Sequence, residues 1–125
     1  MDAAINLLTE KLIGAAIEVH RELGPGLLES AYHKALEHEL RLRGIPFESE
    51  KPCAVSYKGT IIENAYRLDL LVDNTVVIEL KTVEGLTEVH EAQLLTYLKF
   101  TGCRIGLLFN FNATVLTKGL RRLVR

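Results

Sequence analysis

Apolar residues recur at every third or fourth position through two stretches near the start of the chain. The first covers residues 2–23 and the second about residues 27–43. This spacing collects apolar side chains on one face of a helix, so two amphipathic helices are predicted. The segment Gly24-Pro25-Gly26 separates them, and Gly44 followed by Pro46 ends the second.

Extended segments fill the middle of the chain. The pattern predicts a strand from Phe47 to Tyr57, placed at a sheet edge because Pro52 cannot donate a ladder hydrogen bond. A Lys58-Gly59 turn leads into a second strand, Thr60 to Val72. A third strand, Val76 to Lys81, opens with three β-branched residues and is predicted to be buried on both faces.

The final third of the chain alternates helix and strand. A helix from Glu88 to Thr101 follows Thr87, a suitable N-cap, and stops at Gly102. Residues 104–109 form a short apolar strand, and the tail to residue 125 forms a fifth. This order predicts one α/β domain over residues 1–125, a mixed sheet of four to five strands flanked by helices, with a parallel crossover through the last helix.

Period-two alternation sorts the side chains of the second strand into two faces. The two predicted sets are Glu63, Arg67, Asp69 and Leu71 on one face, and Tyr66, Leu68 and Leu70 on the other. Arg67 then flanks Asp69, where it either holds a substrate phosphate or pairs with Asp69 or Glu63. Pairing is the simpler interpretation.

Charged residues interrupt the apolar third strand. Glu79 and Lys81 lie two positions apart, so they leave the strand on the same face. The turn before this strand decides whether Asp69 joins them. A two-residue hairpin at positions 73–74 would send the two carboxylates to opposite faces, whereas a three-residue loop at 73–75, or a bulge, pairs Asp69 with Glu79.

In the three-residue register the Asp69 and Glu79 carboxylates lie about 5 Å apart, the spacing of opposed cross-strand side chains. Buried charges without partners are costly, so a ligand is expected to compensate them. Two carboxylates on one wall are typical of a site for a hard cation such as Mg²⁺. Lys81 beside them can polarise a water or stabilise a developing anion.

These residues resemble a known family pattern. The segment Asp69-x9-Glu79-x-Lys81 is similar to the signature of the PD-(D/E)xK nuclease superfamily, with Leu68 where the signature has proline. Gln93 in the following helix matches a Gln that many members carry. Upstream, Gly26-x-x-Glu29-x-x-Tyr32 resembles the motif of the small bacterial GxxExxY family, and this resemblance covers nearly the whole chain.

The resemblance implies a restriction-endonuclease-like core and Mg²⁺- or Mn²⁺-dependent hydrolysis of nucleic acid, with DNA preferred over RNA. The catalytic residues that it implies are Asp69, Glu79, Lys81, Glu29 and Gln93. The metal ligands that it implies are Asp69, Glu79, Glu29 and the backbone carbonyl of Leu80.

Ordinary structural roles are alternatives for the helix-borne residues. Acids favour the first turn of a helix because of its dipole, which is sufficient to explain Glu29. Gln93 in a largely apolar helix can be a structural hydrogen-bonding group. Tyr32 is interpreted as a core residue with a hydrated hydroxyl, and Gly26 as a position that needs positive φ or a close backbone approach.

Composition limits the class of protein further. The chain is 48% hydrophobic and 25% charged, which is sufficient for a real core, and charges in its first helix argue against a signal peptide or membrane span. Cys53 and Cys103 lack metal-ligand spacing and are expected to be reduced, which indicates the cytoplasm. The four histidines also show no ligand spacing and are expected at the surface.

The net charge of −1 gives no overall footprint for nucleic acid. A basic cluster near the C-terminus either contacts nucleic acid or protects an edge strand, and its members are Lys118, Arg121, Arg122 and Arg125. A non-catalytic scaffold or binding module with a nuclease fold is therefore the alternative function. The intact Asp69, Glu79 and Lys81 favour the nuclease, because a scaffold gains nothing from three partly buried charges. A homodimer is expected, since two small domains grip a duplex better than one.

Overall fold

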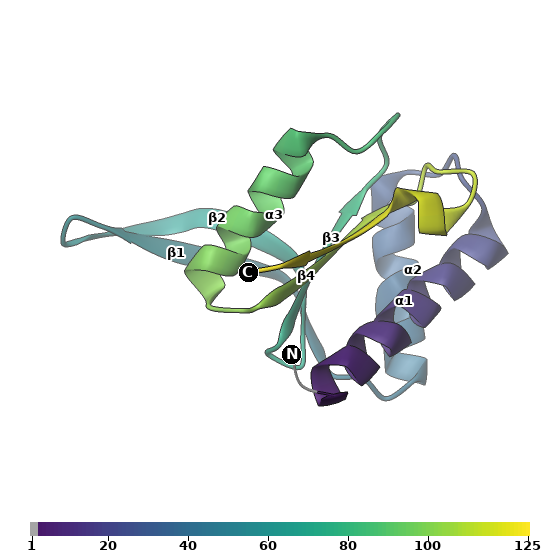
Figure 1. Ribbon diagram of the computed structural model, residues 1–125, viewed down its shortest axis with the longest axis horizontal. Coiled ribbons are helices and arrows are strands. Elements are labelled where there is room, and N and C mark those ends of the chain that lie inside the picture. Colours follow the sequence, from purple (N-terminus) through teal and green to yellow (C-terminus); the bar gives the residue numbers. More distant parts are fainter. Residues whose placement is uncertain (1–2) are drawn as a thin grey trace.

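The computed structural model describes residues 3–125 of the chain (Figure 1). Its elements are α1 (Ala3–Leu23), α2 (Glu29–Leu42), β1 (Phe47–Tyr57), β2 (Thr60–Val72), β3 (Val76–Lys81), α3 (Glu88–Thr101), β4 (Ile105–Asn110), the 3-10 helix η1 (Leu116–Gly119) and β5 (Leu120–Val124). Every predicted helix and strand is confirmed, and η1 is an addition. The predicted start of the first helix at residue 2 lies outside the described residues.

The five strands form one mixed sheet in the order β1-β2-β3-β4-β5. Strands β3 and β4 are parallel and are connected through α3, which confirms the parallel crossover, and the other neighbours are antiparallel. Helices α1 and α2 lie against one face of the sheet and α3 against the other (Figure 1). β1 and β5 are the edge strands, as Pro52 and the C-terminal charges indicate.

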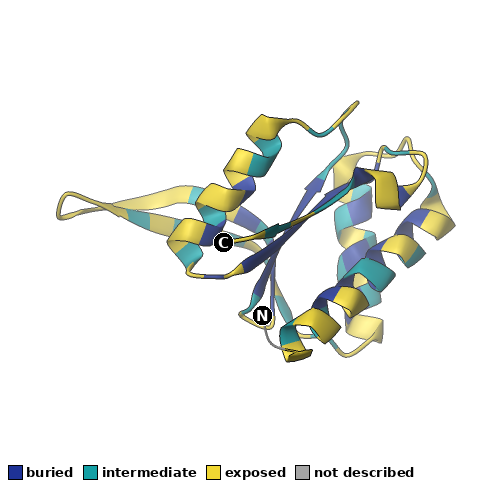
Figure 2. Cartoon of the chain, viewed as in Figure 1, coloured by how far each residue is buried: buried dark blue, intermediate teal, exposed yellow. Residues whose placement is uncertain are grey.

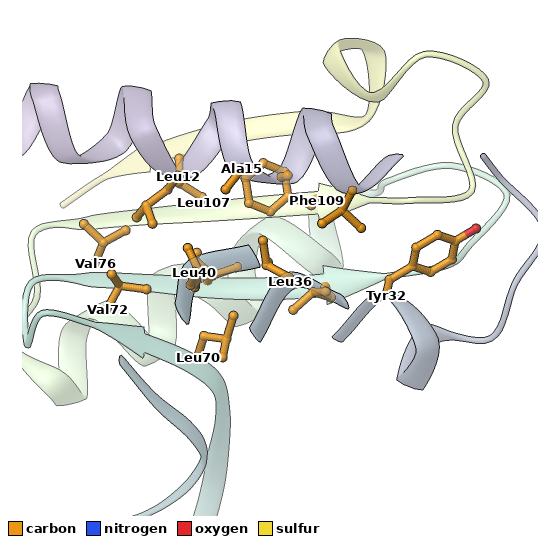
Figure 3. Close-up of a cluster of buried hydrophobic side chains, with 14 of the residues drawn as sticks. Leu12, Ala15, Tyr32, Leu36, Leu40, Leu70, Val72, Val76, Leu107 and Phe109 are labelled. Atoms are coloured by element: carbon orange, nitrogen blue, oxygen red, sulfur yellow. The ribbon is translucent and has the colours of Figure 1, made fainter. Parts of the chain in front are cut away.

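Two apolar clusters hold these layers together. The larger one packs Leu12 of α1 and Leu36 of α2 against Leu70, Val76 and Leu107 of the sheet (Figure 3). The smaller one packs α3 against the opposite face, through Leu94 and Leu98 among others. Because helices cover both faces, β3 and β4 are buried along nearly their whole length, and their sequences are almost continuously apolar (Figure 2).

The distal halves of β1 and β2 project beyond the helices as a two-stranded arm (Figure 2). Residues 60–65 of this arm are all exposed. Its apolar side chains are exposed as well, with Tyr57 at 57%, Ile61 at 62% and Ile62 at 44% of their full accessibility. The arm therefore presents apolar surface that this chain does not bury.

The predicted strict alternation of β2 is wrong at Asp69. Leu68 packs in the cluster beneath α3, whereas Leu70 packs in the cluster beneath α1 and α2, so they do not share a face. Glu50, in the β1 segment opposite Asp69, has a left-handed backbone with φ of 50°. A local irregularity in the strand pair re-aims the side chains there, as β-bulges do, and it falls at the proposed site.

Candidate active site

The turn between β2 and β3 sets the register of the two strands. Val72 pairs with Val76, which confirms the three-residue loop at positions 73–75. Asp73 and Asn74 both adopt left-handed backbone conformations, with φ of 50° and 54°, and the Thr75 amide donates to the Val72 carbonyl at 2.9 Å. Asp and Asn tolerate this conformation better than most residues, so the loop can form here.

Strands β2 and β3 stop pairing just before the two carboxylates. The last register pair is Leu70 with Ile78, and beyond it side chains replace backbone acceptors. The Asp69 amide donates to Oε1 of Glu79 at 3.2 Å, and the Leu80 amide donates to Oδ2 of Asp69 at 2.8 Å. Each carboxylate is therefore held by the backbone of the opposite strand, and the structure brings Asp69 and Glu79 together.

Glu79 is a strongly perturbed acid. It is only 5% exposed, and burial together with the negative charge of Asp69 raises the pKa of its carboxyl group to about 9. A hydrogen bond with the Asp69 side chain also raises this pKa, whereas the Asp69 amide and Lys81 lower it. At neutral pH without a cation, the pair therefore retains a proton that two separate carboxylates would lose.

Lys81 and Gln93 meet at the end of β3 that lies nearest α3. Nζ of Lys81 donates to Oε1 of Gln93 at 3.1 Å. Tyr97 lies one helical turn after Gln93, and its hydroxyl pKa is raised by burial and by the charges of Glu79 and Asp69, while a hydrogen bond from Gln93 lowers it. Lys81, Gln93 and Tyr97 thus form a polar wall beside the acid pair.

Sequence reasoning missed Tyr97 as a member of this wall. The signal was its position, four residues after Gln93 and therefore on the same face of α3. A tyrosine in an apolar helix is ordinarily a core residue, so this spacing alone could not distinguish the two roles.

Glu29 approaches the pair from the opposite side, at the start of α2. Partial desolvation and the charge of Asp69 raise the pKa of the Glu29 carboxyl group, and Lys81 and His33 lower it. These interactions place Glu29 within electrostatic reach of both Asp69 and Lys81. The structure thus gathers all five predicted residues around one region, three from the strands and one from each flanking helix.

Tyr32 positions the segment that precedes Glu29. Its ring is fully buried and stacks on Phe111 with a centroid distance of 4.8 Å, which confirms the core role. Its hydroxyl donates to the carbonyl of Gly24 and accepts from the amide of Leu27 at 3.1 Å, so it binds the backbone at both ends of the Gly24–Leu27 segment. Gly26 has φ of 104°, which confirms the predicted positive φ.

Two predictions about polar residues are wrong, namely the ion pair of Arg67 and the surface position of His20. In the described chain, Arg67 is exposed and forms no ion pair with Asp69 or Glu63, so its guanidinium remains available. His20 is buried, and its Nε2 lies 2.7 Å from the Ala113 carbonyl oxygen. Long-range packing of α1 against the loop after β4 explains that burial, and no local pattern reveals it.

The donor set fits a hard divalent cation. No group of three or more His, Cys, Asp or Glu side chains within residues 3–125 is arranged to hold a metal by itself. Mg²⁺, however, is usually bound through one or two carboxylates, with water and substrate phosphate completing its octahedron. Asp69 and Glu79 each engage one oxygen with an amide, so each retains a second oxygen for a cation.

The α/β domain carries an acid pair where two strands diverge, a lysine two residues after the second acid, and helices on both faces of the sheet. These features together define a nuclease-like class of protein. The chain belongs to the PD-(D/E)XK nuclease superfamily, whose family model matches residues 6–123. Membership indicates a nuclease-type function on nucleic acid, in a superfamily that generally uses divalent metals.

Neither the curated proteins nor the solved structures gave a match to this chain. Across residues 3–125, no helix is both long enough and apolar enough to cross a membrane.

Proposed function

We propose that this domain, residues 1–125, is a Mg²⁺- or Mn²⁺-dependent nuclease that hydrolyses phosphodiester bonds. Asp69 and Glu79 would hold the metal, with the Leu80 carbonyl as a further ligand and Glu29 as a ligand or relay. A bound divalent cation would polarise the scissile phosphate and lower the pKa of a water molecule. The nucleophile is water, so no covalent protein intermediate is required.

Lys81 and Gln93 act on the reacting groups beside the carboxylates. The Lys81 ammonium stabilises negative charge that develops on the phosphate and orients the attacking water. Gln93 accepts from Lys81 at 3.1 Å, which fixes the direction of the ammonium group. Tyr97 accepts a hydrogen bond from Gln93, which helps to hold the Gln93 amide group in place.

The observation that carries this proposal is the reciprocal hydrogen bonding of Asp69 and Glu79 across the point where β2 and β3 separate. It holds two carboxylates together although burial and their proximity raise the pKa of Glu79 to about 9. A scaffold would be better served by apolar residues there, because a buried acid pair without a cation is unfavourable. The net charge of −1 favours the scaffold instead.

We also propose narrower features of this nuclease. The chain falls in the GxxExxY group. Its Gly26-x-x-Glu29-x-x-Tyr32 segment supports this, because the Tyr32 hydroxyl binds the backbone of Gly24 and Leu27 just before Glu29. DNA is its substrate in preference to RNA, and its two free cysteines accord with a cytoplasmic location. A homodimer formed through the exposed apolar arm of β1 and β2 is consistent with the accessibility of Tyr57, Ile61 and Ile62.

A cleavage assay tests the proposed activity. Purified protein with Mn²⁺ should cut a labelled DNA oligonucleotide, and EDTA should abolish the cleavage. Glu79→Gln and Lys81→Ala should each lower the rate by about 10²-fold or more, the range of effects for positioned charged groups. Glu84→Gln and Lys99→Ala, exposed residues of the same types, are the matched controls and should leave the rate unchanged. Equal cleavage by all four variants would identify a contaminant and contradict the proposal.

A further inference from the structure

A pocket of about 340 Å³ opens beside Asp69, on the side of the sheet that α2 covers. Its lining residues are Glu29, Ser30, His33, Lys34, Glu37, Glu50, Arg67 and Asp69. Glu29 and Asp69 belong to the proposed catalytic site, so the pocket and the reacting phosphate share a wall. The hydrolysis described above uses none of the other six.

Two lining residues, His33 and Glu37, belong to a network of polar groups with Ser49 of β1, which does not itself line the pocket. Nε2 of His33 lies 2.8 Å from Oγ of Ser49 and 3.3 Å from Oε2 of Glu37, and the Ser49 hydroxyl donates to Glu37. The His33 and Glu37 side chains are only 12% and 17% exposed. The network is not a serine-hydrolase triad, because one His33 nitrogen faces both partners and the hydroxyl proton is directed to Glu37.

Two cations at the same pocket form no ion pair among the described residues, although four carboxylates share the lining, those of Glu29, Glu37, Glu50 and Asp69. Arg67 on β2 and Lys34 on α2 are both exposed, and neither forms an ion pair with a carboxylate of the described residues. The Glu37 carboxylate is already engaged by His33 and Ser49, so it does not neutralise them. A free guanidinium is well suited to bind phosphate through two parallel hydrogen bonds.

We propose that this pocket binds one unstacked nucleotide next to the scissile phosphate, and that the substrate is therefore a single-stranded segment of nucleic acid. Arg67 and Lys34 bind the flanking phosphate, and the His33–Ser49–Glu37 network contacts the base edge. This inference rests on the proposed nuclease function.

The size of the pocket explains the preference for a single strand. Its volume of about 340 Å³ is at the lower end of the range for small-ligand pockets, which suits one nucleotide but no stacked base pair. A nucleotide in a duplex must first leave its stack and lose its pairing to enter such a pocket, and one in a single strand need not.

The first experiment measures cleavage by wild type with Mn²⁺ on a single-stranded DNA oligonucleotide and on the same sequence in a blunt duplex. The single strand should be cut at least about tenfold faster, since base extrusion from a duplex is unfavourable. Arg67→Ala and Ser49→Ala should lower the rate of single-strand cleavage more than the rate of duplex cleavage. The melting temperature of the protein should stay unchanged. Arg104→Ala, an exposed arginine outside the pocket, is the matched control and should change neither rate.

A second experiment needs no cleavage. Deoxyadenosine 5′-monophosphate is added to the metal-free wild type, and the histidine ring signals are followed by NMR. The His33 signals should shift, and those of His38, which is exposed on the same helix, should not. Equal cleavage of the single strand and the duplex, or His33 signals that do not shift, would overturn the nucleotide pocket. Absence of cleavage on both substrates overturns the proposed nuclease function, and the His33 shift then decides the pocket alone.

Discussion

Glu79 is a buried acid whose state depends on what occupies the space beside it. Without a cation, burial and Asp69 raise the pKa of its carboxyl group from 4.5 to about 9. If a divalent cation binds as proposed, the same two carboxylates would be its ligands and both would ionise. The residue is therefore better suited to exchange a proton for a metal than to anchor the fold.

The raised pKa predicts how stability depends on pH in EDTA. Between pH 4.5 and about 9, the folded state retains a proton on Glu79 that the unfolded state releases. The free energy of unfolding should therefore fall as pH rises through this window, by at most about 1.4 kcal/mol per pH unit from this group. Glu79→Gln keeps the acceptor for the Asp69 amide and removes the titration, so its stability should vary less with pH.

Denaturant unfolding of both proteins in EDTA, at several pH values from 5 to 9, checks this. Glu84→Gln, an exposed loop residue, is the control and should follow the wild type. A drop of about 3–5 kcal/mol for Glu79→Gln at pH 7 would contradict the account, because that is the effect of breaking a structural buried ion pair.

At the scale of elements, the site depends on how α2 and α3 are seated on the sheet. Tyr32 ties the loop before α2 to its own helix through Gly24 and Leu27, which fixes the position of Glu29. On the other face, Leu94 of α3 packs against the backbone of β4 at Gly106, where an added Cβ would lie 2.9 Å from both Leu94 methyl groups. Gln93 adjoins Leu94 in sequence, so this contact sets the distance between the Gln93 and Lys81 side chains.

Gly106→Ala should therefore disturb both stability and catalysis. The new methyl group pushes α3 away from the sheet, which should lower the free energy of unfolding by about 1–3 kcal/mol, as overpacking commonly does. The Lys81–Gln93 hydrogen bond should lengthen, and Mn²⁺-dependent cleavage should slow. Thermal melting and the cleavage assay measure the two effects.

Gly85→Ala is the matched control for this variant, because an added Cβ there meets nothing within 4 Å. It should behave as the wild type does. A Gly106→Ala protein with wild-type stability and wild-type activity would show that α3 is not held at this point.

The same elements show what the sequence could and could not predict. Helices and strands were predictable because apolar periodicity is local. The three-residue turn was predictable because a two-residue hairpin would send Asp69 and Glu79 to opposite faces. The break in alternation at Asp69 was not predictable, because it involves Glu50 in a neighbouring strand. The His33–Ser49–Glu37 network was not predictable either, because its partners are 12 and 16 residues apart and meet only when α2 packs on β1.

At the scale of the whole molecule, a net charge of −1 conceals a local separation of charge. Lys81, Lys34 and Arg67 lie around the acid pair, and in the described chain none of them is ion-paired with a carboxylate. The C-terminal basic residues lie instead on or beside the edge strand β5, where charge protects an open edge. Nucleic acid would thus be held by a few cations at the site and not by an extended basic face.

The proposed chemistry depends on divalent cation binding at Asp69 and Glu79, which calorimetric titration of Mn²⁺ at pH 7 measures. Repeating the titration in two buffers of different ionisation enthalpy gives the number of protons released. The wild type should bind with release of about one proton per metal, since the acid pair must give up its shared proton to a cation. Glu79→Gln should bind at least about tenfold more weakly and release none. Binding of equal affinity in both proteins, or none in the wild type, would contradict the account.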